Sequence, residues 1–515
     1  MDTGRYRCSG DRENRPMADG SGNIGTERPL SAMQNERNIP YTNLRDWLEE
    51  AEKLGEVRYV EGASWERDIG MATEVVQHDE KAPCVVFSEV PGTLEGSRLL
   101  VNFFAGKRMN MTLGFPSEMS KVELSDAFRT GYVENMPEIQ HEIIDDGPIF
   151  ENVMEGDDID VEAFPAPLWH EEDGGRYVGT GSYNVTRDPN TGWINVGTYR
   201  VMIHSKNEVG FYISPGKHGR IHRDKYAELG EPMPTVIVAG GDPMTFLMGT
   251  SDIPSGTCEY DVIGGFRGAA MKLVEGKHTG LPFPADAEIV IEGFVHMDDK
   301  RPEGPFGEWT GYYGSQMRAE PVMEIKAIYY RNKPILFGCP PQRPPDEVAR
   351  FRSITRSAML KENIKAAGVP DVQDAWLHEV GTARMLMGVS IKQRYPGHSK
   401  QAGHIACQCQ VGAYAGKYVI VTDEDIDVSN LEELIWAMLT RSEPSESIDI
   451  IRGTWSTHLD PRISPEDKAK GNLTNSRAII DACRPFHWKD EFPKVNAPSL
   501  ELAKESREKW GYLCD

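Results

Sequence analysis

The sequence lacks the features that mark several common protein classes. No run of about 18 apolar residues occurs, so a membrane-spanning helix is not expected. The 8 cysteines include no C-x-x-C pair, which disfavours a zinc ribbon or a disulfide scaffold and favours reduced thiols in a cytoplasmic protein. Lys and Arg number 56 against 80 Asp and Glu, for a net charge of −24. This balance disfavours nucleic acid as a partner, because phosphate binding needs clustered cations.

Common nucleotide and hydrolase motifs are also missing. The chain has no G-x-x-x-x-G-K-[ST] loop, no strand–G-x-G-x-x-G–helix unit and no G-x-S-x-G elbow. Residues 1–38 have no apolar segment typical of a secretory signal and are rich in Gly, Ser, Asn and Arg. We therefore expect a disordered extension there.

Length and composition indicate a multidomain globular protein. The chain has 515 residues, of which 39% are hydrophobic and 26% charged, enough for two or three buried cores. The pattern is mixed α/β first, then rich in strands, then mixed again, so the expected class is α+β. The predicted divisions are an extension (1–38), an N-terminal α/β domain (39–150), an antiparallel β-barrel or sandwich (151–340), a C-terminal α/β domain (341–498) and a final helix (499–515).

Periodicity and turn residues predict the individual elements. A helix over residues 42–54, capped by Thr42 and ended by Gly55, has one apolar face. Residues 145–167 are acidic and contain prolines, which is typical of a linker. The predicted strands cover residues 57–60, 84–87, 99–104, 178–187, 193–204, 235–239, 288–296, 322–331, 335–338, 377–391 and 417–421, and the later predicted helices cover 431–440 and 499–511.

Two acids lie close together in Glu-Gly-Pro-Phe-Gly-Glu at residues 303–308. Pro and Gly exclude a helix interior, so Glu303 and Glu308 belong to a shaped loop. Paired carboxylates can keep one member protonated near neutral pH. An isolated pair is more often two solvated acids on a turn.

An arginine stands in the apolar run 193–204, within Trp-Ile-Asn-Val-Gly-Thr-Tyr-Arg. A buried guanidinium needs a carboxylate or an anionic ligand. Strict alternation places Asn195 and Arg200 on opposite faces, so a common site needs a bulge, which we expect at Gly197. The alternative is an Arg200 at the sheet rim in a structural salt bridge.

Three further segments carry polar groups. His218 and Glu259 offer ligands that, with an amide oxygen, suit Mn²⁺ or Mg²⁺. Spacing alone is weak evidence, because His218 and His222, four residues apart, are as easily surface residues, and without further support the surface reading is preferred. The segments 342–347 and 392–400 are charged, Pro-containing loops of the kind that carry function on a rigid scaffold, or are simple turns.

Taken in order, these segments resemble the UbiD family of decarboxylases, over about residues 44–441. The resemblance rests on N-V-G-T-Y-R (195–200), G-G-F-R-G (264–268), E-G-P-F-G-E-x-x-G-Y (303–312), R-P-P-D-E (343–347) and Y-P-G-H-S-K (395–400). It implies a reversible, non-oxidative decarboxylase of an aromatic, heteroaromatic or α,β-unsaturated acid. The implied cofactor is prenylated FMN, made by a UbiX-like prenyltransferase.

The resemblance also implies roles for individual residues. Arg200, Glu303 and Glu308 match the catalytic triad, with Glu308 as proton donor. Asn195, His218 and Glu259 match the ligands of a divalent ion, Mn²⁺ or Mg²⁺, beside a K⁺ that shares Glu259 and carbonyls near Met248, Gly249 and Ser251. The implied cofactor-binding residues are Trp193, Asn195, Thr198, Lys217, His218, Met248 and Glu259.

The family further implies that residues 151–340 form a split β-barrel that binds the prenylated flavin, and that the C-terminal α/β domain forms homodimers or homohexamers. Glu at position 308, rather than Asp, is similar to the branches that act on acrylic, furan, pyrrole or larger aromatic acids. Two alternatives stay open. One is a conventional FMN oxidoreductase on a split barrel, and the other is a carboxylase subunit of a multisubunit complex.

Overall fold

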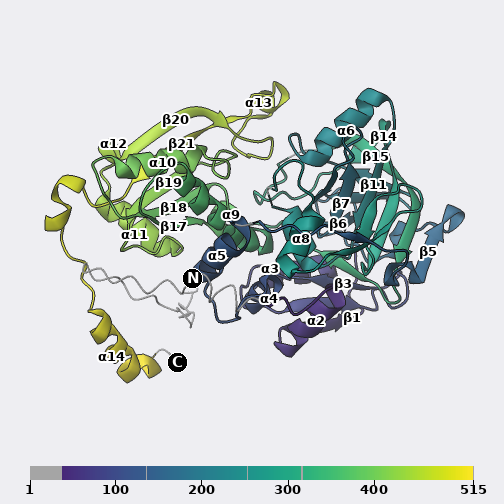
Figure 1. Ribbon diagram of the computed structural model, residues 1–515, viewed down its shortest axis with the longest axis horizontal. Coiled ribbons are helices and arrows are strands. Elements are labelled where there is room, and N and C mark those ends of the chain that lie inside the picture. The colour runs from purple at the N-terminus through teal and green to yellow at the C-terminus, as the bar shows by residue number, and fades with distance from the viewer. Residues whose placement is uncertain (1–37, 135, 252, 315–316, 514–515) are drawn as a thin grey trace, which may run out of the picture.

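The fold is known from a computed structural model that describes residues 38–134, 136–251, 253–314 and 317–513. The predicted extension therefore lies, apart from residue 38, outside the described residues. Helices and antiparallel and mixed sheets occur together, so the predicted α+β class is confirmed. Figure 1 shows two bodies, one built on the curled central sheet and one on the C-terminal sheet, with α9 (Glu347–Ala366) between them.

The N-terminal unit is a four-stranded sheet of order β1-β2-β3-β16. Its last strand comes from the far end of the barrel sequence and pairs in parallel with β3, Ile335 opposite Arg98. The N-terminal unit and the barrel are thus joined by a shared strand. The bounds are β1 Val57–Glu61, β2 Cys84–Ser88, β3 Arg98–Val101 and β16 Ile335–Gly338.

Helix α2 (Leu44–Lys53) covers this sheet. The predicted apolar face is buried, and Gly55 follows the helix with φ 74°. The N-cap is Asn43, not Thr42 as expected, since the Asn43 side chain accepts from the backbone N–H groups of Arg45 and Asp46. The other helices of this region are α3 Asp68–Gln77, α4 Lys107–Leu113, α5 Lys121–Phe128 and the π-helix η1 Arg129–Val133.

The central sheet has the order β6-β9-β10-β15-β14-β11-β7-β8 and is antiparallel throughout. It curls into the expected split barrel around a long hairpin of β14 and β15. The bounds are β6 Tyr177–Gly179, β7 Tyr183–Arg187, β8 Ile194–Gly197, β9 Val201–Ser205, β10 Glu208–Phe211, β11 Met233–Val238, β14 Ile289–Glu303 and β15 Arg318–Tyr330.

Two stretches of this sheet that we predicted as single strands each form two strands, so both predictions are wrong. Residues 178–187 divide into β6 and β7, and residues 193–204 divide into β8 and β9. In each pair the chain changes its pairing partner: β8 lies against β7, whereas β9 lies between β6 and β10. A continuous apolar run cannot reveal such a change, because both halves remain buried.

The predicted linker at residues 145–167 is only partly a connection. Residues Asn152–Glu155 form β5, which pairs with β15 at the edge of the barrel. Phe150 packs edge-on against Tyr329 with ring centroids 5.2 Å apart. Short 3₁₀ helices occupy the rest: η2 Pro148–Glu151, η3 Gly156–Asp158 and η4 Val161–Ala163.

Three helices and a small sheet cover the barrel. Helix α6 packs on β7, β8 and β11, and α8 packs on α7 and β8. The small sheet has the order β13-β12-β4, and the segment before β4 is hydrogen-bonded to α8 through Ile139 N–H and the Asp261 carbonyl. The bounds are α6 His218–Leu229, α7 Pro243–Gly249, α8 Glu259–Arg267, β4 Glu142–Ile143, β12 Lys272–Glu275 and β13 Pro282–Pro284.

The C-terminal body is a five-stranded sheet of order β17-β18-β19-β21-β20. The single strand predicted at residues 377–391 is wrong, because the chain reverses at η5 and β17 runs antiparallel to β18. The bounds are β17 Val372–Leu377, η5 Glu379–Gly381, β18 Leu386–Ile391, α10 His398–Gln408, β19 Tyr418–Asp423, α11 Leu431–Arg441, α12 Pro444–Ser447, β20 Ile448–Trp455, α13 Pro465–Ala469, β21 Thr474–Asp481 and η6 Phe486–Glu491.

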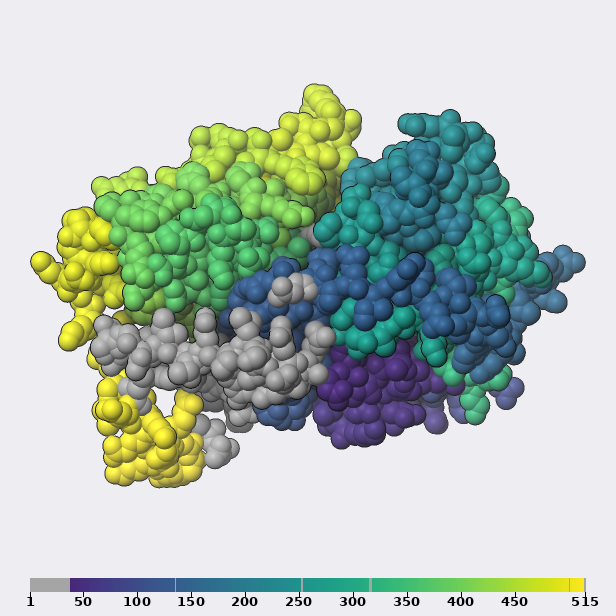
Figure 2. Space-filling view, viewed as in Figure 1, coloured from purple at the N-terminus to yellow at the C-terminus, as the bar shows by residue number. Residues whose placement is uncertain are grey.

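The end of the chain forms α14 (Leu500–Trp510) and η7 (Gly511–Leu513), apart from both bodies in Figure 1. Over the described ranges, none of the helices has the length and apolar character needed to cross a membrane. Figure 2 shows a notch at the top of the view, between the yellow-green C-terminal surface and the teal barrel surface.

Trp47 is predicted to hold α2 to the N-terminal core. It is fully buried, its ring centroid lies 5.3 Å from that of Phe103, and its Nε1–H donates to Thr112 Oγ1 at 2.9 Å. Trp47→Ala should lower the free energy of unfolding by about 3–5 kcal/mol, through the lost contacts and the cavity left behind. Chemical denaturation measures this. The control, Trp510→Ala in α14, removes a half-exposed ring and should change little. Equal effects would contradict the assignment.

Candidate active site

The bend at residues 303–308 lies at the end of β14. Glu303 is the last residue of that strand, opposite Arg318 of β15. Gly304 has φ 84°, a left-handed conformation that favours glycine. Gly174 N–H donates to the Pro305 carbonyl at 2.8 Å, and a Cβ on Gly174 would lie 2.0 Å from the Gly304 oxygen. The glycines therefore let two chain segments pack closely and fix the direction of the bend.

Arg200 lies in the break between β8 and β9. We expected a bulge at Gly197, but the structure instead ends β8 at Gly197 and begins β9 at Val201. The reason is local packing: the Tyr199 hydroxyl would lie 2.3 Å from a Cβ on Gly197. Tyr199 OH also accepts from Gly219 N–H at 3.1 Å, which ties the break to α6. The interruption, rather than a bulge, turns Arg200 toward the two acids.

Arg200 bridges Glu303 and Glu308. Its Nε and Nη2 donate to the two oxygens of Glu303, both at 2.7 Å, and Nη1 donates to Glu308 Oε1 at 2.5 Å. The Glu303 side chain is fully buried, and the side chains of Arg200 and Glu308 are each 10% exposed. Burial lowers the pKa of Arg200, but the charge of Glu308 and the bonds to Glu303 outweigh it and raise the pKa.

Aromatic rings enclose this ion-paired group. The guanidinium carbon of Arg200 lies over the faces of two aromatic rings. It is 5.5 Å from the ring centroid of Phe306 and 4.8 Å from that of Tyr212. Tyr177 donates its hydroxyl proton to Glu303 Oε1 at 3.2 Å. Burial and the charge of Glu303 raise the pKa of Tyr177 well above its usual value, so the phenol stays protonated. The surroundings exclude water and strengthen the ion pairs.

A cavity of about 180 Å³ opens beside Arg200 and Glu308. Its wall combines barrel residues with α7, with the segment after β16 and with the first two turns of α9. The lining residues are Gly179, Thr180, Ser182, Thr198, Tyr199, Arg200, Tyr212, Ser214, Lys217, Phe246, Thr250, Phe306, Gly307, Glu308, Trp309, Cys339, Pro341, Val348, Phe351 and Arg352.

The predicted cofactor-binding residues divide between this cavity and its surroundings. Thr198 and Lys217 line the cavity. Met248 does not: it is buried in the apolar core, beside a smaller apolar cavity of about 40 Å³, and its carbonyl accepts from Ser251 N–H at 2.9 Å. Ser182, which we did not predict, also lines the main cavity, and its buried hydroxyl has no hydrogen-bond partner among the described residues.

The predicted metal ligands lie on β8 and at the starts of α6 and α8, two helices that pack on that strand. Asn195 is buried on that strand, and the next residue, Val196, donates its N–H to Glu259 Oε2 at 2.8 Å. Trp193 has its ring centroid 4.9 Å from that of His218 at the start of α6. Burial raises the pKa of Glu259 to about 8, with the bond from Val196 opposing it. In the described chain no ion pair to Glu259 is found.

The remaining motifs lie elsewhere. Residues 264–268 form the end of α8, and residues 395–400 lead into α10 of the C-terminal body. Residues 343–347 start α9, where the Asp346 side chain caps Ala349 N–H at 2.8 Å. We did not predict α9, which supplies Val348, Phe351 and Arg352 to the cavity. The signal was present as Asp346 followed by a helix-forming run without Gly or Pro.

Comparison with known proteins gives the class. Residues 142–344 match the 3-octaprenyl-4-hydroxybenzoate carboxy-lyase Rift-related domain, and residues 349–482 match the C-terminal domain of the same enzymes. Together these two matches cover more than half of the chain, so the protein is an enzyme of the carboxy-lyase class. The chain belongs to the UbiD family.

Individual relatives span nearly the whole chain. The pyrrole-2-carboxylic acid decarboxylase of Pseudomonas aeruginosa is 28% identical, over 86% of this chain and 92% of its own. The phenolic acid decarboxylase of a Streptomyces species is 29% identical, over 87% and 93%. The UbiD-class enzyme HmfF from Pelotomaculum thermopropionicum, solved in complex with FMN, has a TM-score of 0.78 at 25% identity, covering 90% of this chain and 100% of its own.

The buried charge of Glu303 gives a stability prediction. Glu303→Gln removes the bidentate partner of Arg200 and leaves a buried cation with less opposite charge. We expect a loss of about 3–5 kcal/mol in unfolding free energy. Glu208→Gln is the matched control, because Glu208 pairs with Arg301 on the same sheet but at a more exposed position. It should change stability little. Chemical denaturation measures both variants. If Glu303→Gln and Glu208→Gln lost similar amounts of unfolding free energy, the buried ion pair between Glu303 and Arg200 would not have the stabilising role assigned to it.

Proposed function

We propose that this enzyme decarboxylates an aromatic, heteroaromatic or α,β-unsaturated carboxylic acid with prenylated FMN, and that Arg200, Glu303 and Glu308 are its acid–base group. The supporting observation is the pair of carboxylates held by one guanidinium on the wall of the cavity. The two curated relatives are named for decarboxylation of a heteroaromatic and a phenolic acid. A TM-score of 0.75 to an evolved form of HmfF with prenylated FMN supports the cofactor.

Arg200 has donors to spare for a substrate. A guanidinium has five N–H donors, and the bonds to Glu303 and Glu308 use one each on Nε, Nη1 and Nη2. These three bonds leave one N–H on Nη1 and one on Nη2 unused among the described residues. They match the two oxygens of a carboxylate. Glu303 fixes the plane of the guanidinium, so the two unused N–H donors would orient the substrate carboxylate.

Position makes Glu308 the proton donor. Glu303 is fully buried, and both of its oxygens accept from Arg200. Glu308 accepts from Nη1 of the same guanidinium and lines the cavity. Glu308 is therefore the acid that a bound substrate would meet, and its carboxyl group would carry the transferred proton. It would deliver that proton to the carbon that loses carbon dioxide.

The cavity wall carries hydrogen-bonding groups that suit the polar groups of a flavin. The unpaired Ser182 hydroxyl and the nearby Thr198 and Ser214 hydroxyls could bond to ring or ribityl groups, and Lys217 could meet a phosphate. When bound, prenylated FMN would supply an electrophile that accepts the electrons released with carbon dioxide. The chain's own residues would hold the acid, exclude water and return the proton.

A divalent ion would bind at Asn195, His218 and Glu259. An amide oxygen, an imidazole and a carboxylate suit Mn²⁺ or Mg²⁺. Glu259 supports this choice, because it is buried with only backbone N–H contacts and lacks a compensating cation among the described residues. A K⁺ would share Glu259 with carbonyls near Met248, Gly249 and Ser251.

Wider properties of the family complete the proposal. The reaction would be reversible, a UbiX-like prenyltransferase would supply the cofactor, and the chain would form homodimers or homohexamers in the cytoplasm.

The test is to coexpress the full chain with a flavin prenyltransferase and to screen unsaturated and aryl acids for deuterium exchange at the carbon that bore the carboxyl group. Bleaching and reoxidation of an ordinary flavin with reduced nicotinamide, without exchange, would overturn the proposal in favour of an FMN oxidoreductase.

Glu308→Gln removes the acidic proton and keeps the size of the side chain. We expect turnover to fall by about 100-fold or more, with flavin and metal still bound. Glu308→Asp is the matched control and should retain part of the activity, since it keeps a carboxylic acid. Turnover is measured with the acid found in the exchange screen. Normal turnover of Glu308→Gln would exclude Glu308 as the donor.

His218→Ala removes the imidazole ligand. We expect most of the flavin and manganese to be lost on gel filtration, measured by flavin absorbance and by metal analysis. His296→Ala removes an imidazole from the exposed side of β14 in the same domain and should leave both amounts unchanged. Undiminished flavin and manganese in His218→Ala would rule out the metal assignment.

A further inference from the structure

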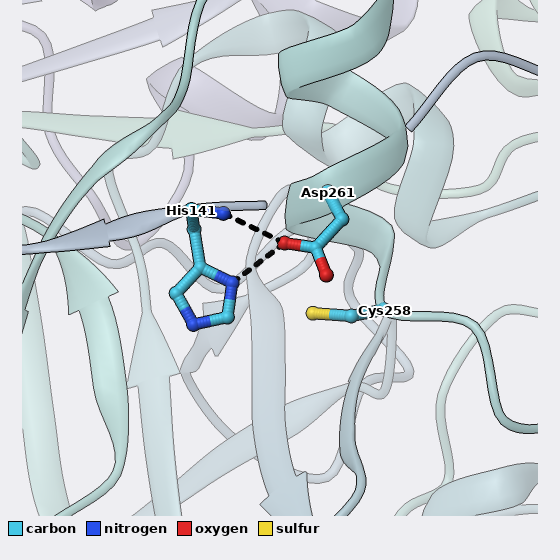
Figure 3. Close-up of side chains that lie close together, drawn as sticks. All are labelled: His141, Cys258 and Asp261. Atoms are coloured by element: carbon cyan, nitrogen blue, oxygen red, sulfur yellow. Dashed lines mark hydrogen bonds and ion pairs between the residues drawn. The ribbon is translucent and has the colours of Figure 1, made fainter. Parts of the chain in front are cut away.

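Three potential metal ligands converge outside the cavity. The His141 ring, the Cys258 thiol and the Asp261 carboxylate come from segments far apart in the sequence, and their ligand atoms all lie within 4.8 Å of one another. Figure 3 shows the three side chains pointing toward a common space. Over the described ranges, this is the one group of at least three His, Cys, Asp or Glu residues that meets this spacing.

The fold holds these residues rigidly. Cys258 is the N-cap of α8, and Asp261 lies three residues later in its first turn, on the same side of the helix. His141 is tied to that turn by two bonds to Asp261 Oδ1, from its backbone N–H at 2.9 Å and from Nδ1 at 2.6 Å (Figure 3). Ile139 N–H adds a bond to the Asp261 carbonyl at 2.9 Å.

Two glycines of α8 allow this close approach. A Cβ on Gly265 would lie 2.0 Å from the Pro137 oxygen, and a Cβ on Gly264 would lie 2.8 Å from the Ile139 oxygen. The chain then continues into β4, which pairs with β12. The segment that carries His141 is therefore clamped against the helix that carries the other two ligands, which is the preorganisation that a metal site needs.

The group is separate from the ion site proposed for the flavin. Glu259, between Cys258 and Asp261 in sequence, points to the other side of α8 and accepts from Val196 of β8. Cys258 and Asp261 instead face residues 139–143. The donor sets also differ, because the flavin-associated set contains no sulfur.

We propose that His141, Cys258 and Asp261 bind a Zn²⁺-like divalent ion, with water completing the coordination. A thiolate, an imidazole and a carboxylate form a donor set that zinc accepts. On binding, the Nδ1 proton of His141 moves to Nε2 through solvent, the thiol proton passes to water, and the ion takes the place of the hydrogen bond between His141 and Asp261. Side-chain exposures of 19% for His141 and 20% for Asp261 leave a path for the ion.

The bound ion would cross-link the segment before β4 to the first turn of α8. That turn also carries Glu259, so the ion would steady a helix on which the flavin site depends. Binding itself does not rest on the proposed decarboxylase activity and can be measured in flavin-free protein.

Co²⁺ titration of the full-length, flavin-free, chelator-treated chain tests the proposal. We expect a near-ultraviolet thiolate-to-cobalt charge-transfer band that saturates at one Co²⁺ per chain and is displaced by Zn²⁺. Cys258→Ser should abolish the band, and His141→Ala and Asp261→Asn should each weaken Co²⁺ binding about tenfold or more. Circular dichroism shows whether each variant folds.

Two controls locate the ion. Cys409→Ser changes another partly buried thiol, at the end of α10, and should leave the band intact. Glu259→Gln removes a ligand of the flavin-associated ion and should also leave it intact. Absence of a sulfur band in the folded wild-type chain, or a band that survives Cys258→Ser, overturns the proposal.

Discussion

The structure depends on one buried guanidinium held between two carboxylates. Removing Arg200, Glu303 and Glu308 from water costs several kcal/mol per ion, and only close, well-directed hydrogen bonds offset that cost. The fold meets this requirement with a broken strand that turns Arg200 inward, a glycine bend that returns Glu308 to it, and rings of Tyr177, Tyr212 and Phe306 around the group.

Both bodies of the protein hold the loop that carries Glu308. On the barrel side, Gly174 bonds to Pro305, and Tyr313 OH donates to Asp173 at 3.2 Å. On the C-terminal side, the Arg384 guanidinium lies 5.2 Å from the centroid of Trp309, and Lys468 donates to the Gly314 carbonyl at 2.9 Å. The position of the proposed proton donor thus depends on how the two bodies meet.

Helix α8 joins three parts of the structure. Its first residue, Glu259, reaches β8, Asp261 binds the segment before β4, and Arg267 pairs with Asp242 at 2.7 Å beside α7. Its glycines were visible in the sequence as part of a family motif, but their purpose was not. They serve close packing of residues 137–139 rather than a ligand loop, which is a property of the neighbouring chain and not of the motif itself.

The sequence by itself determined the class, the family resemblance and most strand positions, because burial periodicity and Gly–Pro bends are local signals. It pointed to Arg200, Glu303 and Glu308 only through that resemblance, since the residues alone left solvated acids and a rim salt bridge open. It did not determine where apolar runs break, since both halves of residues 193–204 are buried. It missed α9, whose many buried positions conceal a helical face. Only the tertiary structure decided that β16 completes the N-terminal sheet and that His141 meets Cys258, because such pairings depend on chain segments that no local pattern relates.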